Sequence, residues 1–306
     1  MKSERHGLLL IDKPTNMTSH DVVGRVRKIL GQKSVGHTGT LDPLATGLMI
    51  LVLGEATKLS DYLTAADKSY SQKIKLGLTT DSLDRTGTVV REVAVDLPEE
   101  KIRQAVNALE GEFDWAVPLF SAAKIDGKKL YEYGRKGEDV ERPLKRMKFW
   151  DIEAREIGRD HLEVRLACSK GSFIRSWTSQ LGENLGCGAC VEELRRLTVG
   201  TWNVTQARTL EELEQGMDLG EAFVPMNRAL PDLKPIVASP REMKLMSNGQ
   251  IARDMVTRLI FEQKQAISTQ TPVYVKVLTG AGDLLAILAA EPGQGLKIRR
   301  VFRHGT

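Results

Sequence analysis

Hydrophobic residues along this chain follow two periods, one typical of strands and one of helices. GLLLIDKP is a short continuous apolar run that ends at Pro14, which is typical of a buried strand. In TSHDVVGRVRKILG, residues 18–31, apolar residues recur at helical spacing between a cap at Thr18 or Ser19 and a stop at Gly31. These two segments predict a strand followed by a helix.

Strands and helices alternate irregularly through the next part of the chain. LPEEKIRQAVNALEG starts with Pro98 and two glutamates and stops at Gly111, and SFIRSWTSQLGENLG stops at Gly186, so both are predicted helices. Apolar runs predict further strands at LMILVLG, KSYSQKIKLGLTT and HLEVRLACS. Because a steady strand–helix–strand repeat is absent, the order favours an α+β fold with a mixed, mainly antiparallel sheet and flanking helices.

The pattern changes after residue 230. LPDLKPIVASP carries three prolines in eleven residues and is interpreted as a linker. Short apolar strands separated by glycine-containing turns follow at PVYVKVLTG, DLLAILAA and LKIRRVF. We therefore expect two domains, residues 1–231 and a small β-rich domain at 232–306.

Composition narrows the class of protein only modestly. A net charge of +4 permits an anionic partner, and no apolar run reaches the length of about 18 residues that a membrane span needs. The apolar run Leu8–Ile11 is shorter than a signal-peptide core, and three cysteines suit a reducing compartment, so we expect a cytoplasmic protein. Cys187 and Cys190 form one CxxC pair without a second, so no metal site is predicted and buried cysteines are the better interpretation.

One basic segment is a candidate nucleic-acid contact. Residues 124–148 hold nine Lys or Arg against five Asp or Glu, with Tyr131 and Tyr133 between them. Cations can contact a nucleic-acid backbone and tyrosines can stack on bases, but a solvated charged loop has the same composition. The C-terminal KIRRVFRHGT adds a second basic stretch, which favours RNA or DNA.

The segment GHTGTLDPLATG, residues 36–47, surrounds Asp42 with three glycines and three threonines. Because Pro43 disfavours helical geometry at Asp42, this acid lies in a shaped loop, where it either caps a turn or meets a partner. Arg175 is a candidate partner, since a nearby guanidinium keeps a carboxylate ionised, although such an arginine is often a surface or capping residue. Phosphate-loop, dinucleotide and GxSxG motifs are absent, and DSLDRTG has the wrong spacing for calcium.

These motifs together resemble a known family. GHTGTLDPLATGLMILVLGEATKL is similar to the signature of bacterial TruB-type tRNA pseudouridine-55 synthases. DKPTNMTSHDVV resembles the family's N-terminal motif, KSY its tyrosine-bearing strand, and CSKGSFIRS with LGENLGCGACVEELRRLTVG its arginine-bearing block. VPLFSAAKIDGKKLYEYGRKGEDVERP is similar to the RNA-gripping thumb, at about residues 117–148, and the last 70 or so residues resemble a PUA domain.

The resemblance implies an activity and a set of site residues. The family flips one uridine out of the T-loop of tRNA, breaks its N1–C1′ bond and rejoins the base through C5. The resemblance implies that glycines of the Asp42 loop let it approach the ribose closely. It also implies a catalytic set of Asp42, Tyr70 and Arg175, a substrate set of His37, Lys13, Pro14, Phe173 and Leu194, and RNA-backbone contacts from Lys128, Lys129 and Arg135.

The resemblance also implies that no cofactor or metal is needed, that tRNA is bound through its T-arm, and that the protein is a monomer without an obligate protein partner. A guide-RNA-dependent pseudouridylase of the dyskerin type and a non-catalytic tRNA-binding or tRNA-folding protein are the alternatives. Thr38, Leu44 and Ala45 and the thumb segment favour the stand-alone enzyme. Phe173 and Phe120 replace the family's usual tyrosines, so each keeps a stacking face and loses a hydroxyl.

Overall fold

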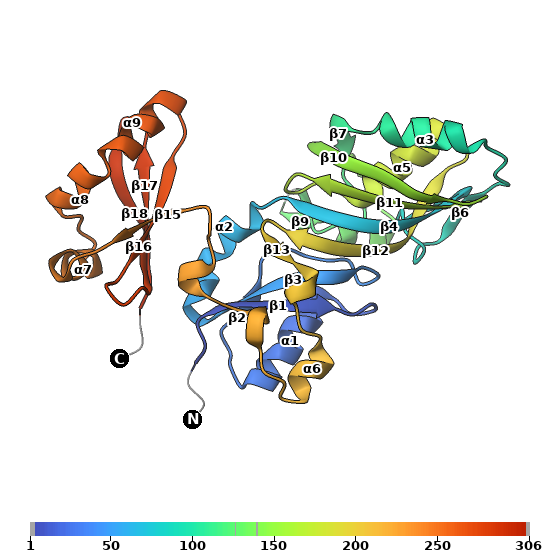
Figure 1. The fold of residues 1–306 in the computed structure, drawn as a ribbon. Coiled ribbons are helices and arrows are strands. Elements are labelled where there is room, and N and C mark those ends of the chain that lie inside the picture. The colour runs from blue at the N-terminus through green and yellow to red at the C-terminus, as the bar shows by residue number, and fades with distance from the viewer. Residues whose placement is uncertain (1–3, 126, 139, 304–306) are drawn as a thin grey trace.

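The structure is a computed structural model that describes residues 4–125, 127–138 and 140–303. Within these residues ten strands form one sheet, in which eight follow the order β14-β1-β3-β12-β4-β11-β10-β7 while β2 pairs with β3 and β13 with β12 (Figure 1). The pairs are antiparallel apart from β12 with β3, which run parallel. The strands are β1 (Gly7–Lys13), β2 (Val35–His37), β3 (Thr46–Leu53), β4 (Lys68–Leu76), β7 (Gly111–Ala116), β10 (Leu144–Ile157), β11 (His161–Cys168), β12 (Ala189–Val199), β13 (Trp202–Asn203) and β14 (Phe223–Pro225).

The longer helices that pack against this sheet are α1 (Ser19–Leu30), α3 (Glu99–Asn107) and α5 (Ile174–Leu185). The cap of α1 is Thr18, whose hydroxyl accepts a hydrogen bond from the amide of Asp21. Ser19, the alternative cap, is buried and bonds elsewhere. Gly31 and Gly186 end α1 and α5 in the left-handed conformation, as predicted.

The predicted end of α3 is wrong. The helix stops at Asn107, and Gly111 instead begins β7 with a φ of 131° that a side chain would strain. The shorter elements of this part of the chain are η1 (Gly54–Leu59), α2 (Ser60–Thr64), β5 (Leu78–Thr80), β6 (Val89–Glu92), η2 (Val204–Gln206), α6 (Leu210–Glu214), η3 (Gly220–Ala222) and η4 (Met226–Arg228).

Two hydrophobic cores occupy the two halves of the large sheet. One gathers around β1, β3 and α1, and includes Leu10, Val22 and Ile50. The other gathers around β4, β11, α3 and α5, and includes Ile74 and Trp177. The chain between β2 and β3, which carries Asp42, lies where these halves meet, and Leu41 and Leu44 belong to the second core.

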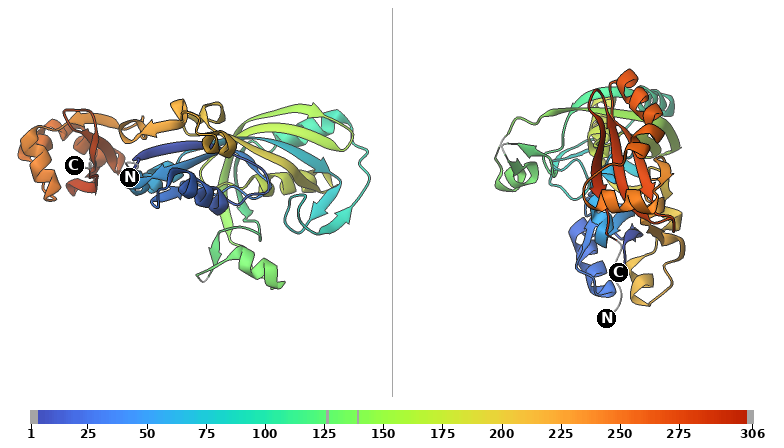
Figure 2. Two further views of the ribbon diagram at one scale, coloured as in Figure 1. Left: turned by 90° about the horizontal axis from the view of Figure 1, so that it is seen from below. Right: turned by 90° about the vertical axis from the view of Figure 1, so that its left-hand side faces the viewer.

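A narrow extension leaves the sheet between β7 and β10. It consists of β8 (Lys124–Ile125), β9 (Lys128–Lys129) and α4 (Leu130–Lys136). Figure 2 shows this green segment projecting away from the body of the molecule. The basic segment of the sequence is therefore a folded hairpin and helix.

A second sheet near the C-terminus has the order β15-β16-β17-β18 within the described residues. Its strands are β15 (Lys234–Val237), β16 (Val273–Leu278), β17 (Leu284–Glu291) and β18 (Gly295–Val301), and α7 (Pro240–Ser247), α8 (Arg253–Arg258) and α9 (Ile260–Thr269) accompany them (Figure 1). The β-rich prediction is confirmed, but the linker prediction is wrong because β15 lies inside it, at the sheet edge that tolerates Pro235. The three helices were not predicted.

The second sheet packs on the first part of the chain. Leu284, Ile287 and Phe302 belong to the core around β1 and β3. Tyr62 meets Tyr274 edge to face, with ring centroids 5.6 Å apart. No helix within the described ranges is long and apolar enough to cross a membrane.

Candidate active site

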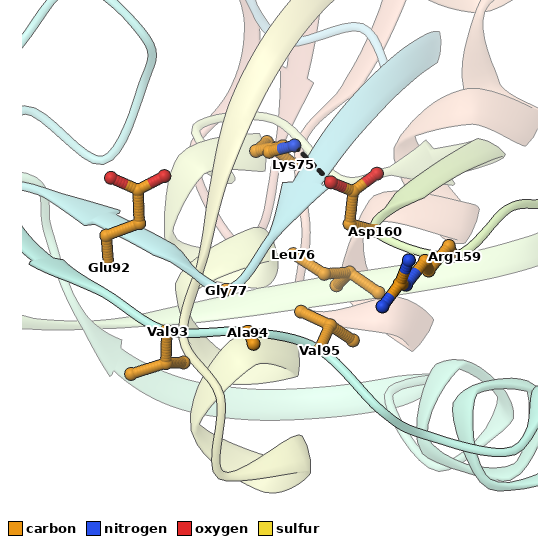
Figure 3. Close-up of a pocket in the computed structure, with 9 residues that line it drawn as sticks. All are labelled: Lys75, Leu76, Gly77, Glu92, Val93, Ala94, Val95, Arg159 and Asp160. Atoms are coloured by element: carbon orange, nitrogen blue, oxygen red, sulfur yellow. Dashed lines mark hydrogen bonds and ion pairs between the residues drawn. The ribbon is translucent and has the colours of Figure 1, made fainter.

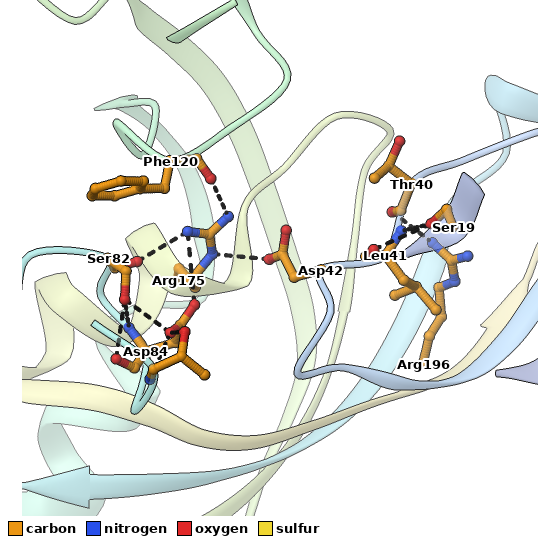
Figure 4. Close-up of polar contacts among 10 residues, drawn as sticks. Ser19, Thr40, Leu41, Asp42, Ser82, Asp84, Phe120, Arg175 and Arg196 are labelled. Atoms are coloured by element: carbon orange, nitrogen blue, oxygen red, sulfur yellow. Dashed lines mark hydrogen bonds and ion pairs between the residues drawn. The ribbon is translucent and has the colours of Figure 1, made fainter. Parts of the chain in front are cut away.

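Asp42 lies in the loop between β2 and β3, and its carboxylate is paired. Its Oδ2 is 2.9 Å from Nε of Arg175, in the first turn of α5 (Figure 4). Arg175 is 4% exposed, so it is not a surface arginine. The side chain of Asp42 is 33% exposed, which leaves the carboxylate open on the side away from Arg175.

The guanidinium of Arg175 is held by three further groups. Nη1 donates to the carbonyl of Ser82 at 2.9 Å, and Nη2 donates to the carbonyl of Phe120 at 3.0 Å (Figure 4). The carboxylate of Asp84, which is buried, lies 3.9 Å from Nη1. DSLDRTG, residues 81–87, forms a turn that the structure brings to the site, which the sequence did not indicate.

A cavity of about 350 Å³ opens beside this pair. Five predicted site residues line it: Asp42, Tyr70, Phe173, Arg175 and Leu194. The structure therefore brings together four separate stretches of the chain, since Phe173 and Arg175 both lie at the start of α5. A cavity of this size, with a few polar groups among apolar walls, is typical of a small-ligand site.

Tyr70, on β4, forms one wall of this cavity and is almost fully buried. Burial raises the pKa of its phenol, because the charged form loses solvation. The hydroxyl is therefore protonated at neutral pH and presents a ring face with a polar end.

Lys13, Pro14 and His37 are adjacent to the Asp42 loop and do not line the cavity. Nζ of Lys13 donates to the carbonyls of Pro14 at 2.8 Å and Pro43 at 3.2 Å, and burial lowers its pKa to about 8. The ring of His37 lies edge-on to that of His20, 5.5 Å between centroids. Burial lowers the pKa of His37, and its Nδ1 has no hydrogen-bond partner among the described residues.

The predicted RNA-backbone residues lie on the extension. Lys128 is placed over the ring of Tyr133, and Lys129 and Arg135 over the ring of Tyr131. The base of the extension, Ser121–Ala123, borders the cavity. The extension therefore begins at the site and carries its cations outward.

The sequence interpretation missed three cavity-lining cations: Lys68, Lys145 and Arg196. Nζ of Lys145 lies 5.7 Å from the ring centroid of Phe173, at the cavity wall. Among the cavity's lining residues Asp42 is the single carboxylate. The cavity wall therefore carries more cations than anions and suits an anionic ligand, a property that no local motif in the sequence reveals.

A second cavity, of about 340 Å³, lies at the far end of β4 (Figure 3). Lys75 and Asp160, which both line this second cavity, form an ion pair, so their charges neutralise each other. Cys187 and Cys190 are buried, and burial raises the pKa of Cys190 to about 11. In the ranges that the structure describes, no three metal-binding side chains cluster.

Two family models match consecutive parts of the chain. Residues 27–174 match the N-terminal domain of the TruB family of pseudouridylate synthases, and residues 175–230 match the C-terminal domain of tRNA pseudouridylate synthase B. A tRNA pseudouridine synthase B from Bdellovibrio bacteriovorus is 46% identical over 308 residues, which cover 99% of each chain. This chain belongs to the TruB family of pseudouridylate synthases.

Other relatives carry the same name. Those from Solibacter usitatus and Ralstonia nicotianae are 39% and 38% identical, over 92% and 94% of this chain and 94% and 91% of theirs. The family resemblance inferred from the motifs is confirmed. The protein is an enzyme of the pseudouridine synthase class, whose members are isomerases.

Solved structures share the fold of this TruB-family chain. A chain in the crystal structure of a Cbf5-Nop10-Gar1 complex has a TM-score of 0.71 at 25% identity, covering 97% of this chain and 85% of its own. Another, in an H/ACA RNP bound to a substrate RNA containing 2′-deoxyuridine, has a TM-score of 0.69 at 23% identity. The α+β fold class predicted from the sequence is confirmed.

Proposed function

We propose that this protein converts uridine-55 in the T-loop of tRNA to pseudouridine, acting as a monomer on the T-arm without a guide RNA or partner protein. The observation that carries the proposal is the ion pair of Asp42 and Arg175 at the wall of a cavity with Tyr70. The names of the relatives support tRNA as the substrate.

The reaction rearranges one nucleotide without a net change of atoms. The N1–C1′ bond breaks, the base turns, and a C5–C1′ bond forms, while C5 loses a proton and N1 gains one. Asp42 adds to the sugar or base or removes a sugar proton, and by each route its carboxylate must be ionised. The guanidinium of Arg175 pairs with this carboxylate at 2.9 Å and holds it at the cavity wall.

The cavity walls suit a flipped base. Extruding a base from a folded loop costs a few kcal/mol of lost stacking, which new contacts in the pocket must offset. In the proposal the ring of Tyr70 stacks on the base and its hydroxyl assists removal of the C5 proton. Phe173 and Leu194 are apolar walls of the same cavity.

The other predicted residues act outside the cavity in this proposal. Lys13, the last residue of β1, and Pro14, directly after it, support the Asp42 loop, and His37 enters the space that the flipped nucleotide leaves. Lys128, Lys129 and Arg135 contact the RNA backbone from the thumb, the extension at about residues 117–148. Residues 232–306 form a PUA-like RNA-binding domain, and residues 1–231 form the catalytic domain.

The test is release of tritium from a tRNA transcript that carries 5-tritiated uridine. The parent protein alone, on bare transcript, should release tritium, and Asp42→Asn should release at least about 100-fold less, because a positioned carboxylate contributes that much or more. Replacing uridine-55 by cytidine in the transcript should abolish release. Tight tRNA binding by the parent without tritium release would instead support the non-catalytic alternative.

A requirement for an added guide RNA would support the dyskerin-type alternative. The assay on bare transcript therefore distinguishes the stand-alone enzyme, the guide-dependent enzyme and the non-catalytic binding protein. Sedimentation of the parent protein at assay concentration checks the monomer.

A further inference from the structure

The backbone of the Asp42 loop is anchored at every position. Each carbonyl from Thr38 to Leu44 accepts a hydrogen bond, and most of the donors come from other parts of the chain. In chain order the donors are Thr64 Oγ1, Arg196 Nη2, Arg196 Nη1, Ser19 Oγ, the amide of Ala45, Asn16 N with Lys13 Nζ, and Thr15 Oγ1. A loop held in this way does not need to be ordered by its substrate.

Arg196 makes the largest contribution to this anchoring. Its Nε donates to the carbonyl of Leu48 at 2.7 Å, and its two terminal nitrogens donate to those of Thr40 and Gly39 at 3.4 Å. One side chain on β12 therefore joins the loop to the start of β3. The planar fork of a guanidinium suits this, because its donors are fixed relative to one another.

Arg196 is also an unusual buried charge. It is 2% exposed, and within the described residues no carboxylate lies within 4.0 Å of its nitrogens. Removing an ion from water costs several kcal/mol unless partners compensate, and here the partners are carbonyls. A buried cation that lacks a carboxylate partner within the described residues and lines the cavity indicates a role beyond packing.

The backbone of Arg196 presses on the same loop. A Cβ added to Gly47 would lie 2.2 Å from the carbonyl oxygen of Arg196, and Gly47 has a φ of 99°. Gly47 is therefore required for the contact between β3 and β12, whereas the resemblance had implied that the loop's glycines serve approach to the ribose. Both the main chain and the side chain of Arg196 determine where the loop begins and ends.

Ser19 holds the residue next to Asp42. Its hydroxyl accepts a hydrogen bond from the amide of Leu41 at 2.9 Å and donates to the carbonyl of Leu41 at 3.2 Å. Figure 4 shows Ser19 and Arg196 on one side of Asp42 and Arg175 on the other. The carboxylate is thus located by contacts from both sides.

We propose that Arg196 is a positioning residue for Asp42: its guanidinium holds the backbone of the loop so that the carboxylate meets Arg175 and the reacting nucleotide. Ser19 assists at Leu41. This inference rests on the proposed function. Because a misplacement of about 1 Å can cost about 100-fold in rate, Arg196 should affect the catalytic step far more than substrate binding.

The experiment compares tritium release by Arg196→Lys and Ser19→Ala with that by the parent. The concentration of folded protein in each preparation is taken from a titration of its tRNA-binding sites, and kcat is calculated per site. Arg196→Lys keeps the charge and loses the fork, so kcat should fall about 10- to 100-fold while KM changes less than about threefold. Ser19→Ala should lower kcat less, by about three- to tenfold.

Arg195→Lys is the matched control. Arg195 is the adjacent residue, its side chain is 41% exposed, and it pairs with Asp12 through two nitrogens at 2.9 and 2.6 Å. We expect this variant to keep kcat within about twofold, as surface changes usually do. An equal loss in both arginine variants would overturn the assignment to Arg196.

Hydrogen exchange of residues 38–45 supplies a readout that is independent of the reaction. The amides of Leu41 and Ala45 should exchange slowly in the parent and at least about tenfold faster in Arg196→Lys, since loss of the anchors favours local opening. If Arg196→Lys has the same kcat per tRNA-binding site as the parent, the positioning role is wrong. The same holds if the amides of residues 38–45 exchange at the parent's rate in this variant. An inactive parent protein with the expected exchange pattern would instead overturn the proposed function alone.

Discussion

The Asp42 loop and the thumb both border one cavity, and they are built in opposite ways. The loop has a hydrogen bond on each carbonyl from Thr38 to Leu44 and buried donors behind it. The thumb projects from the sheet, and its Lys128 and Arg135 are exposed. The difference matches the two tasks proposed for them, because chemistry needs fixed atoms whereas gripping RNA needs accessible charge.

The two regions meet at Arg175. Its Nε contacts the loop at Asp42, and its Nη2 contacts the carbonyl of Phe120, where the thumb begins. A change at this residue should therefore disturb both regions, and changes farther away should disturb one of them.

The largest effect is expected for Arg175→Met. It removes the cation beside Asp42 and leaves the carbonyls of Ser82 and Phe120 without their donor. We expect tritium release to fall at least about 100-fold and the free energy of unfolding to fall by about 3 kcal/mol, since breaking a buried pair is costly. Kinetics and denaturant unfolding check both values, with Arg195→Met as the control, and a variant of normal stability and rate would contradict the coupling.

Neutralising the thumb should affect binding and spare the chemistry. In Lys128→Gln/Lys129→Gln/Arg135→Gln, tRNA affinity should fall about tenfold or more at moderate salt, and the slope of log K against log salt should fall by about 2 to 3. A filter-binding titration over several salt concentrations measures this. The control carries glutamine at the exposed Lys33, Arg91 and Lys101 instead. Equal salt slopes in the two triple variants would support the alternative interpretation, in which the segment is only a solvated charged loop.

Lys13, which donates to the Asp42 loop, makes the stability of the protein depend on pH. Burial lowers its pKa from 10.5 to about 8, so above pH 8 the folded protein carries a neutral Lys13 while the unfolded chain still binds the proton. Stability therefore rises with pH from 8 to about 10, by up to about 1.4 kcal/mol per pH unit from this group. Denaturant unfolding of the parent and Lys13→Met over this range should diverge with rising pH, and parallel curves would be inconsistent with the lowered pKa.

The smallest effect is expected for Phe173→Tyr, at the wall between the two regions. Phe173 keeps the apolar face of the cavity, with Nζ of Lys145 5.7 Å from its ring centroid. A restored hydroxyl adds at most one hydrogen bond, worth about 1 kcal/mol, so the rate should change less than about fivefold. Single-turnover tritium release measures the change, and a gain of more than about tenfold would show that the missing hydroxyl matters.

The sequence predicted regular elements best where their signals are local. Thr18, Asp21 and Gly31 mark the ends of α1 within a few residues of the helix itself, and the apolar runs of β1, β3 and β11 stand out in the same way. It failed for α7, α8 and α9, which were not predicted, and for β15, which contains a proline and acquires its strand form by pairing with β16. Pairing partners distant along the chain are invisible to a local pattern.

For the site, local context indicated Asp42 and Arg175 as candidates, the family motif added Tyr70, and the roles of all three stay predictions. It did not indicate Arg196, because a second arginine in a strand has no local mark, nor the contact of Ser82 with Arg175. These contacts join residues 93 and 148 positions apart.

By itself the sequence determined the class of fold, the family, and an aspartate that proline and glycine keep out of a helix. The tertiary structure decided what surrounds that aspartate. Parallel pairing of β12 with β3 brings Arg196 onto one side of the loop, and packing of α5 brings Arg175 onto the other. Local preferences act over a few residues, whereas a catalytic carboxylate is positioned by side chains that only the folded sheet and helices bring together.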